Sequence, residues 1–420
     1  MGSFSSSSTG PTAGFARLKQ LVKPIVGLTF AISFGALAFL ENVLRIAGFQ
    51  RRRRVLIDCF ELFHYHHIRP VVDRLLTDPR LRVFLLESSR FARQVIRPDI
   101  APHKQFVTSP RVRFIPFDLT ISTDYGAPHW IPHRGFEIAA PHGGGMKANY
   151  NSPERLARYG ALWVVGKRQR NNFSQSVASD AVLEDIGFIV TDQLVNNASD
   201  KTPVLRRLAL DKQLPIVLYA PSYSDKPDLI LMSEEILTTL HSHAQFNIIV
   251  KPHPLLLRPS MTGGTDYGKM LSRLTNERFK VVTATDVPIQ EYMIVSDVLI
   301  SDISSVVFEF LFLDRPILLQ INSRVINYYS GQDYLNDILP AVSIFESAEQ
   351  LAETLRSALE NPKALSFERK RFVEREYFNV GRATDAAVES VYRHLQLPPL
   401  KGCNTSGAHR TMNCMRASSP

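Results

Sequence analysis

Three short polar stretches hold the residues of this chain best suited to bind and activate a phosphorylated ligand. They are PHGGGMK, with His142, Gly143 and Lys147, KPHP at 251–254, and SDISS at 301–305. Each follows an apolar run typical of a buried strand. An imidazole titrates near neutrality and can take a proton from an attacking hydroxyl, whereas lysine and histidine cations attract phosphate. Together the three stretches predict transfer chemistry on a phosphorylated, nucleotide-linked donor.

SDISS is the strongest of these signals because a strand end, an acid and a helix start coincide. The run VLISD predicts a strand that brings Asp302 to its end, and Ser304 and Ser305 favour the start of a helix. Such a helix points unpaired N–H groups and positive dipole charge at one spot, where a phosphate can bind. Glu309 follows five residues after Ser304. It is a candidate acceptor for ribose hydroxyls, or else a solvated or paired acid.

The other two stretches each have a simpler alternative. The glycines of PHGGGMK allow a sharp turn and close approach to a ligand, but the stretch lacks the spacing of a Walker A loop and can be a tight turn. KPHP brings Lys251 and His253 to a strand end, which can also be an ordinary exit. HYHH, from His64 to His67, favours a polar helix start over a metal site, because no acid or cysteine cluster supports it. We expect no metal and no cofactor.

Alternating apolar and amphipathic runs predict the positioning framework, an α/β fold of two doubly wound domains that face each other across a cleft. The expected strands are RVLIDCF, RVFLLES, RVRFIPF, FEIAAP, ALWVVG and GFIVTD, then IVLYAP, FNIIVKP, KVVTA, DVLIS and PILLQ. The expected helices lie near 66–76, 177–185, 231–243, 266–276, 288–295, 304–313 and 347–360. The predicted domains are 55–198 and 203–365, separated by a polar linker and braced by C-terminal helices over 366–397.

The net charge of +9 is concentrated at the chain ends. Residues 1–54 carry eight basic and one acidic residue, and 401–420 carry three basic and none acidic, which leaves −1 for the body. A nearly neutral body argues against nucleic-acid binding. The three cysteines, Cys59, Cys403 and Cys414, lie too far apart to indicate a zinc site or a disulfide framework, so a reducing compartment is expected.

The N-terminal basic segment predicts contact with a membrane. We expect residues 1–14 and 398–420 to be disordered, and residues 15–54 to associate with anionic lipid through the apolar run Pro24–Leu40 and the four arginines that end at Arg54. A tilted span, an interfacial helix and a helix packed on the body are the three alternatives. The positive-inside rule places the body on the cytoplasmic face.

Taken in order, these motifs resemble the CDP-glycerol glycerophosphotransferase family, the primases and polymerases of teichoic-acid-type polymers. HGGGMK keeps His142 and Lys147 at the family spacing, VLYAPSYS keeps Ala220 and Pro221, and KPHP is intact. SDISSVVFEF matches through five residues, which are Asp302, Ser304, Ser305, Phe308 and Glu309. The likeness covers roughly residues 135–360.

The resemblance implies a GT-B fold, with the donor nucleotide bound mainly by the second domain, and peripheral attachment to the cytoplasmic membrane face. His142 would deprotonate a hydroxyl of a lipid- or polymer-linked acceptor, and that hydroxyl would attack the β-phosphorus of CDP-glycerol and release CMP. His253 and Lys251 would stabilise the pyrophosphate, which Ser304 and Ser305 would hold. The remaining candidate binding residues are Gly143, Lys147, Pro221, Ser222, Asp302 and Glu309.

Two departures from the family pattern leave the donor open. The family's GxPRxD survives only as GFIVTD, from Gly187 to Asp192, and Ser224 stands where an APTWR-like element has arginine. CDP-ribitol or another nucleotide-linked polyol is therefore an alternative donor. The alternative functions are a GT-B nucleotide-sugar glycosyltransferase or UDP-sugar 2-epimerase, and a catalytically degenerate membrane-bound scaffold.

Overall fold

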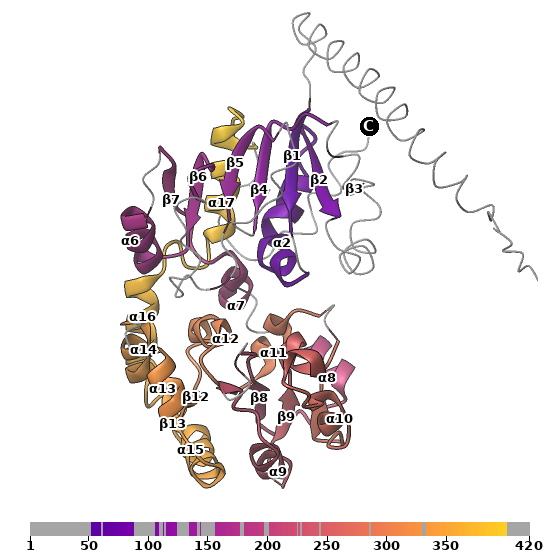
Figure 1. Cartoon of the computed structure of the whole chain (residues 1–420), viewed down its shortest axis with the longest axis vertical. Helices are drawn as coiled ribbons and strands as arrows, with labels where there is room; N and C mark the ends of the chain where they lie inside the picture. The colour runs from indigo at the N-terminus through magenta and orange to yellow at the C-terminus, as the bar shows by residue number, and fades with distance from the viewer. Residues whose placement is uncertain are drawn as a thin grey trace, which may run out of the picture.

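Two parallel β-sheets, one above the other in Figure 1, form the two lobes of the protein. The computed structural model describes residues 52–59, 62–87, 106–108, 112, 115–123, 134–140, 143, 156–176, 180–196, 201–224, 226, 229–242, 245–284, 287–329 and 333–400. Residues 15–51 of the predicted N-terminal membrane segment and the tail after residue 400 lie outside these residues. The last two residues of that predicted segment, Arg53 and Arg54, instead begin the first strand, and Arg54 is buried. No helix in the described ranges has both the length and the apolar character that crossing a membrane requires.

The first lobe is built on a seven-stranded sheet in the order β3-β2-β1-β4-β5-β6-β7. Its strands are β1 (Arg53–Asp58), β2 (Leu81–Glu87), β3 (Phe106–Thr108), β4 (Leu119–Ser122), β5 (Phe136–Ala139), β6 (Ala161–Val164) and β7 (Val182–Asp185). The helices α2 (Leu62–Leu76) and α17 (Ala383–His394) bury their apolar sides on this sheet. Helix α6 (Lys167–Ser176) contributes Phe173 to a separate core on β5 and β6.

The second lobe repeats this plan with six parallel strands in the order β10-β9-β8-β11-β12-β13. The strands are β8 (Ile216–Ala220), β9 (Asn247–Val250), β10 (Phe279–Val281), β11 (Val298–Ser301), β12 (Ile317–Gln320) and β13 (Ser343–Phe345). The helices are α8 (Thr202–Leu208), α9 (Glu234–Ser242), α10 (Tyr267–Ser272), α11 (Ile289–Val295), α12 (Ser305–Phe310), α13 (Ser323–Tyr329), α14 (Asp333–Ile338) and α15 (Ala348–Glu360). Apolar cores on both faces explain why the central strands are continuous apolar runs.

The chain crosses back from the second lobe to the first near its end. Helix α16 (Ser366–Glu376) packs Phe372 and Val373 into the core of the second lobe, whereas α17 belongs to the core of the first. Figure 1 shows α17, coloured yellow, beside the strands of the upper lobe, although it is the last helix in the chain. The C-terminal helices therefore join both lobes.

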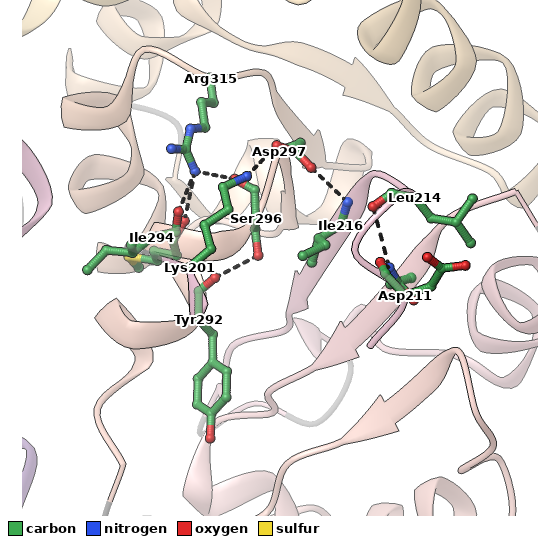
Figure 2. Close-up of polar contacts among 11 residues, drawn as sticks. Lys201, Asp211, Leu214, Ile216, Tyr292, Ile294, Ser296, Asp297 and Arg315 are labelled. Atoms are coloured by element: carbon green, nitrogen blue, oxygen red, sulfur yellow. Dashed lines mark hydrogen bonds and ion pairs between the residues drawn. The ribbon is translucent and has the colours of Figure 1, made fainter. Parts of the chain in front are cut away.

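Polar contacts at the amino-terminal end of the second sheet fix its two central strands (Figure 2). The Arg315 guanidinium donates to the carbonyls of Ile294 and Ser296, at 2.8 and 2.6 Å, where α11 ends. The Asp297 carboxylate accepts from the Lys201 ammonium and from the Ile216 amide, both at 2.9 Å. Because Ile216 begins β8 and Asp297 precedes β11, these bonds align the amino-terminal ends of the two strands. The carboxyl ends of the same strands form the candidate site.

Three sequence-based elements were wrong. The described part of RVRFIPF, Val112 and residues 115–117, forms no strand, and β4 begins after it, at Leu119. Asp118 accepts a hydrogen bond from the Arg54 amide at 2.7 Å, which aligns the chain with β1 from that point. The predicted helix over 177–185 is instead the edge strand β7, and the helix lies earlier, at α6, where a run of polar residues hides the helical period.

GFIVTD, also predicted as a strand, forms the short 3-10 helix Ile189–Thr191 and the start of α7 (Asp192–Asn196). Gly187 has φ +95°, and the chain turns away from the sheet at this residue. The apolar residues of this segment are buried between the two lobes rather than paired in the sheet. The apolar run alone could not distinguish these two ways of burying it.

Candidate functional site

The candidate site lies at the carboxyl ends of β8 and β11, where the strand order of the second sheet reverses. Ligands of open α/β sheets bind at this position. The Asp302 carboxylate, only 5% exposed, accepts hydrogen bonds from the Ser222 amide at 3.1 and 3.0 Å. The structure therefore brings the predicted residues Ser222 and Asp302 together, and Asp302 fixes the exit of β8 against that of β11.

A helix start follows directly from β11, as the sequence predicted. Ser304 is the N-cap of α12, and its hydroxyl accepts from the Val306 amide at 3.3 Å. The Ser304 hydroxyl also lies 3.4 Å from that of Ser301 at the end of the strand. Ser304 is nearly buried, whereas Ser305 is exposed. The Ser305 side chain is thus the more accessible of the two predicted phosphate-binding hydroxyls.

Gly143 of PHGGGMK approaches this helix start from the other lobe. A methyl group at Gly143 would lie 3.8 Å from the β-carbon of Ser305, an ordinary van der Waals distance. Gly143 has φ +89°, a conformation that a side chain disfavours. His142 and Lys147 lie outside the described residues, so their predicted roles stay predictions. The structure nevertheless places one residue of this motif directly on the predicted phosphate site.

The two cationic residues of KPHP have different surroundings. Lys251 is buried, and its ammonium donates to the Ala284 carbonyl and lies 6.0 Å from the centre of the Tyr292 ring. His253 is half-buried and is tied to the exit of β8, because its amide donates to the carbonyl of Pro221 at 3.1 Å. The Lys251 side chain thus supports the segment after β10, and its predicted contact with pyrophosphate stays a prediction.

The His253 ring is held in one orientation by two contacts. Its Nδ1 accepts a hydrogen bond from the Leu255 amide at 3.2 Å, and the ring stacks on Tyr223 at 6.0 Å with an interplanar angle of 23°. An Nδ1 that accepts leaves the proton of the neutral imidazole on Nε2. His253 therefore presents Nε2–H as a donor suited to a phosphate oxygen. Tyr223 was not among the predicted site residues, although it stands in the APSYS element.

Glu309 lies inside the contact between the lobes. It is 1% exposed, accepts a hydrogen bond from the Gln290 amide group, and has its Oε1 3.6 Å from Nε2 of His67 in the first lobe. In this arrangement the carboxylate faces protein partners, as the paired-acid alternative expected, and its contact with a ribose stays a prediction. His67 was missed because HYHH was considered only as a metal site or a helix start.

The two residues that GFIVTD shares with GxPRxD have structural roles. A methyl group at Gly187 would lie 2.2 Å from the Phe378 carbonyl oxygen, so only glycine lets the crossing chain pass. The Asp192 carboxylate accepts from the amides of Ala383 and Thr384, at 3.1 and 2.7 Å, where α17 begins. Both residues therefore hold the C-terminal crossing between the lobes. No metal-binding group of three or more His, Cys, Asp or Glu occurs among the residues described.

Two Rossmann-like lobes with a site at the switch point of the second sheet define a GT-B-like protein. The profile of the family described as CDP-Glycerol:Poly(glycerophosphate) glycerophosphotransferase matches residues 134–393. The matched range includes all three motif stretches and the C-terminal crossing. The chain belongs to this family.

Known proteins share parts of this sequence and its fold. The teichoic acid glycerol-phosphate primase of Bacillus spizizenii is 28% identical over 134 residues, 31% of this chain and about a third (32%) of that protein. A variant of the wall teichoic acid polymerase TagF aligns with a TM-score of 0.66 at 16% identity, over 92% of this chain and 99% of that structure. UDP-GlcNAc 2-epimerase from Neisseria meningitidis aligns with a TM-score of 0.53 at 14% identity, over 81% and 100%. The two structural likenesses confirm the predicted fold.

Proposed function

We propose that this protein transfers glycerol phosphate from CDP-glycerol to a hydroxyl of a membrane- or polymer-linked acceptor and releases CMP. The observation that carries the proposal is the approach of Gly143, from the first lobe, to Ser305 at the start of α12 in the second, so close that an added methyl group would touch Ser305. Family membership supports the same reaction. The name of the related primase, which refers to teichoic acid and glycerol phosphate, is consistent with this donor and acceptor.

In the proposed reaction the acceptor oxygen forms a bond to the β-phosphorus, and the bond from that phosphorus to the oxygen of CMP breaks. His142 takes the proton of the acceptor hydroxyl. The Nε2–H of His253 and the exposed hydroxyl of Ser305 donate to pyrophosphate oxygens, on which charge accumulates as CMP leaves. Tyr223 keeps the His253 ring in place, and Lys147 adds a positive charge beside the acceptor.

The second-lobe residues divide into those that contact the donor and those that support them. Ser304 and Asp302 hold the helix start and the two strand exits in register, so Ser305 and the Ser222 side chain face the donor. Lys251 fixes the segment at Ala284 and keeps a positive charge behind the pyrophosphate. Glu309 binds a ribose hydroxyl only if His67 moves away from it.

Ser224 replaces a family arginine and so removes a cation near the donor site. CDP-ribitol is the alternative donor. We further propose that residues 15–54 hold the enzyme at the cytoplasmic face of a membrane that carries anionic lipid, where a lipid-linked acceptor lies. The basic residues of this segment up to Arg52 support this placement, whereas Arg53 and Arg54 belong to β1, where Arg53 pairs with Asp118 and Arg54 is buried.

The purified full chain, incubated with CDP-glycerol, CDP-ribitol or UDP-GlcNAc and a lipid-linked acceptor, tests the reaction. We expect CMP from CDP-glycerol and neither UDP nor an epimerised sugar from UDP-GlcNAc. His142→Ala and His253→Ala should each reduce transfer at least 100-fold, within the usual range for a lost acid–base or electrostatic group, with unchanged far-UV circular dichroism. Turnover that survives both substitutions would refute the assigned chemistry, and release of UDP would refute the donor class.

A further inference from the structure

A cluster of five buried or half-buried residues joins the lobes behind the phosphate site, and the proposed reaction does not use it. We call it the interlobe cluster; its members are His67, Phe188, Gln290, Glu309 and Tyr377. His67 comes from α2 of the first lobe, and Glu309 lies on α12 of the second, in the same helix whose start carries Ser304 and Ser305. The cluster therefore connects the acceptor lobe to the element that holds the donor.

The surroundings of the His67 ring favour its protonated form. Its Nδ1 lies 2.8 Å from the Phe63 carbonyl oxygen, which can only accept, and its Nε2 faces the Glu309 carboxylate at 3.6 Å. The Phe63 carbonyl keeps a proton on Nδ1. Nε2 makes no hydrogen bond to the described residues, but it lies within ion-pair distance of the carboxylate, which favours a second proton there and thus the imidazolium form. The side chains of His67 and Glu309 are 15% and 2% exposed, so water screens their attraction little.

Aromatic packing fixes the His67 ring as well. The ring stacks on Phe188 at 6.0 Å with an interplanar angle of 14°, and Phe188 in turn stacks on Tyr377 at 6.0 Å and 21°. Phe188 belongs to GFIVTD, and Tyr377 lies where the chain crosses between the lobes. A displacement of His67 would thus disturb the crossing segment as well as α12.

Neutralisation of the Glu309 charge affects how well α12 can bind an anionic donor. The carboxylate lies about one and a half turns along α12 from the predicted pyrophosphate site, and an unpaired buried carboxylate there would repel an anion and be costly to bury. We propose that His67 is a positioning residue: its imidazolium neutralises Glu309 across the lobe interface and holds α12 in the orientation that binds the donor pyrophosphate. This inference rests on the proposed function for its effect on turnover, but the ion pair itself can be tested without activity.

The charges that face the pair set the direction of its pH dependence. Burial by itself lowers the pKa of His67, but the nearby Glu309 carboxylate and the hydrogen bond to the Phe63 carbonyl outweigh burial, and the pKa stands above its ordinary value. The Tyr377 phenol is neutral, because burial and the charges of Glu376 and Glu309 raise its pKa. A histidine whose pKa is raised in the folded state stabilises that state fully at pH values below its ordinary pKa. This stabilisation is lost as the pH rises through the raised pKa.

Histidine-selective NMR of the full chain tests the pair directly. The ¹³Cε1 resonance of His67, identified by its loss in His67→Gln, should titrate at higher pH than an unperturbed histidine, and Glu309→Gln should lower its midpoint. If His67→Gln does not fold, hydrogen exchange of wild-type α12 amides serves instead, and their protection should fall as the pH rises above neutrality. A His67 midpoint that Glu309→Gln leaves unchanged, or α12 protection independent of pH, would overturn the inference.

Kinetics test the consequence for the donor. His67→Gln and Glu309→Gln should each lower kcat/KM for CDP-glycerol about tenfold, chiefly through KM, and the double variant should lose no more than the worse single variant. Asp73→Asn, which breaks the exposed Arg69–Asp73 pair on the same helix, is the matched control and should behave as wild type. Losses that multiply in the double variant would overturn the inference. A chain that shows the NMR coupling but does not use CDP-glycerol would refute the proposed function alone.

Discussion

Gly187 offers a test of how tightly the crossing chain is held between the lobes. It has φ +95°, and a methyl group there would lie 2.2 Å from the Phe378 carbonyl oxygen and 3.1 Å from the Ala383 β-carbon. Gly264 has almost the same φ, +94°, but a methyl group there would meet no atom within 4 Å. Gly187→Ala and Gly264→Ala therefore carry a similar strain in φ and differ in steric overlap.

The expected magnitudes follow from these two effects. A side chain in this backbone region costs on the order of 1–3 kcal/mol, and the stiffer unfolded chain returns about 0.4–1 kcal/mol. Gly264→Ala should thus lower the free energy of unfolding by about 1–2 kcal/mol. Overlap with a fixed carbonyl adds about 1–3 kcal/mol, as in other overpacked sites, so Gly187→Ala should lose about 2–5 kcal/mol. The backbone atoms at Phe378 cannot rotate away as a side chain could.

Urea unfolding of both variants, followed by circular dichroism, measures the difference through the transition midpoint and its slope. We also expect Gly187→Ala to lower transfer activity, because it displaces the segment that carries Phe188 of the interlobe cluster, while Gly264→Ala should keep wild-type activity. Equal losses of stability in the two variants would refute the reasoning, because they would show that the crossing chain yields at Phe378 without cost.

Two further substitutions test single contacts. Asp302→Ala leaves the Ser222 amide without its carboxylate acceptor, so thermal unfolding should show a free energy of unfolding lower by about 1–3 kcal/mol. Steady-state kinetics should show a KM for CDP-glycerol raised about tenfold. An unchanged KM would contradict the role of Asp302 at the site. Although burial opposes it, hydrogen bonds from Ser366 and Lys363 and the charge of Arg369 lower the pKa of Asp314. Asparagine tolerates the φ of +50° at this position, so Asp314→Asn tests the charge alone and should lower the free energy of unfolding by about 1–3 kcal/mol at pH 7. This difference from wild type should disappear as the pH falls below about 4 and through the lowered pKa. A difference that persists at pH 2 would contradict the ion pair.

The sequence alone was sufficient for the fold class and for the central strands of the second lobe. Runs such as VLI at 298–300 and IIV at 248–250 are apolar because both faces of their sheet are covered, and a serine pair soon after such a run marks a helix start. These signals are local, since strand, cap and helix are neighbours along the chain. The motif order that resembles the family was likewise visible without coordinates.

Elements at the edges and between the lobes were not predictable in this way. GFIVTD has the composition of a strand, but it is buried by contacts with residues almost 200 positions later, including Phe378 and Ala383. Strand β7 lies at a sheet edge, and its apolar and polar residues alternate only weakly. Helix α6 has too few apolar residues for them to show a helical period.

The roles of individual polar residues were decided by tertiary structure. Residue types and spacing in the sequence nominated Lys251, Asp302 and Glu309 as ligand contacts, but the fold engages Lys251 with a carbonyl, Asp302 with the Ser222 amide and Glu309 with His67. Sequence spacing determines which residues share a strand end or a helix. Which charge a buried carboxylate meets depends on how the two lobes pack together, and that contact has no local signature in the chain.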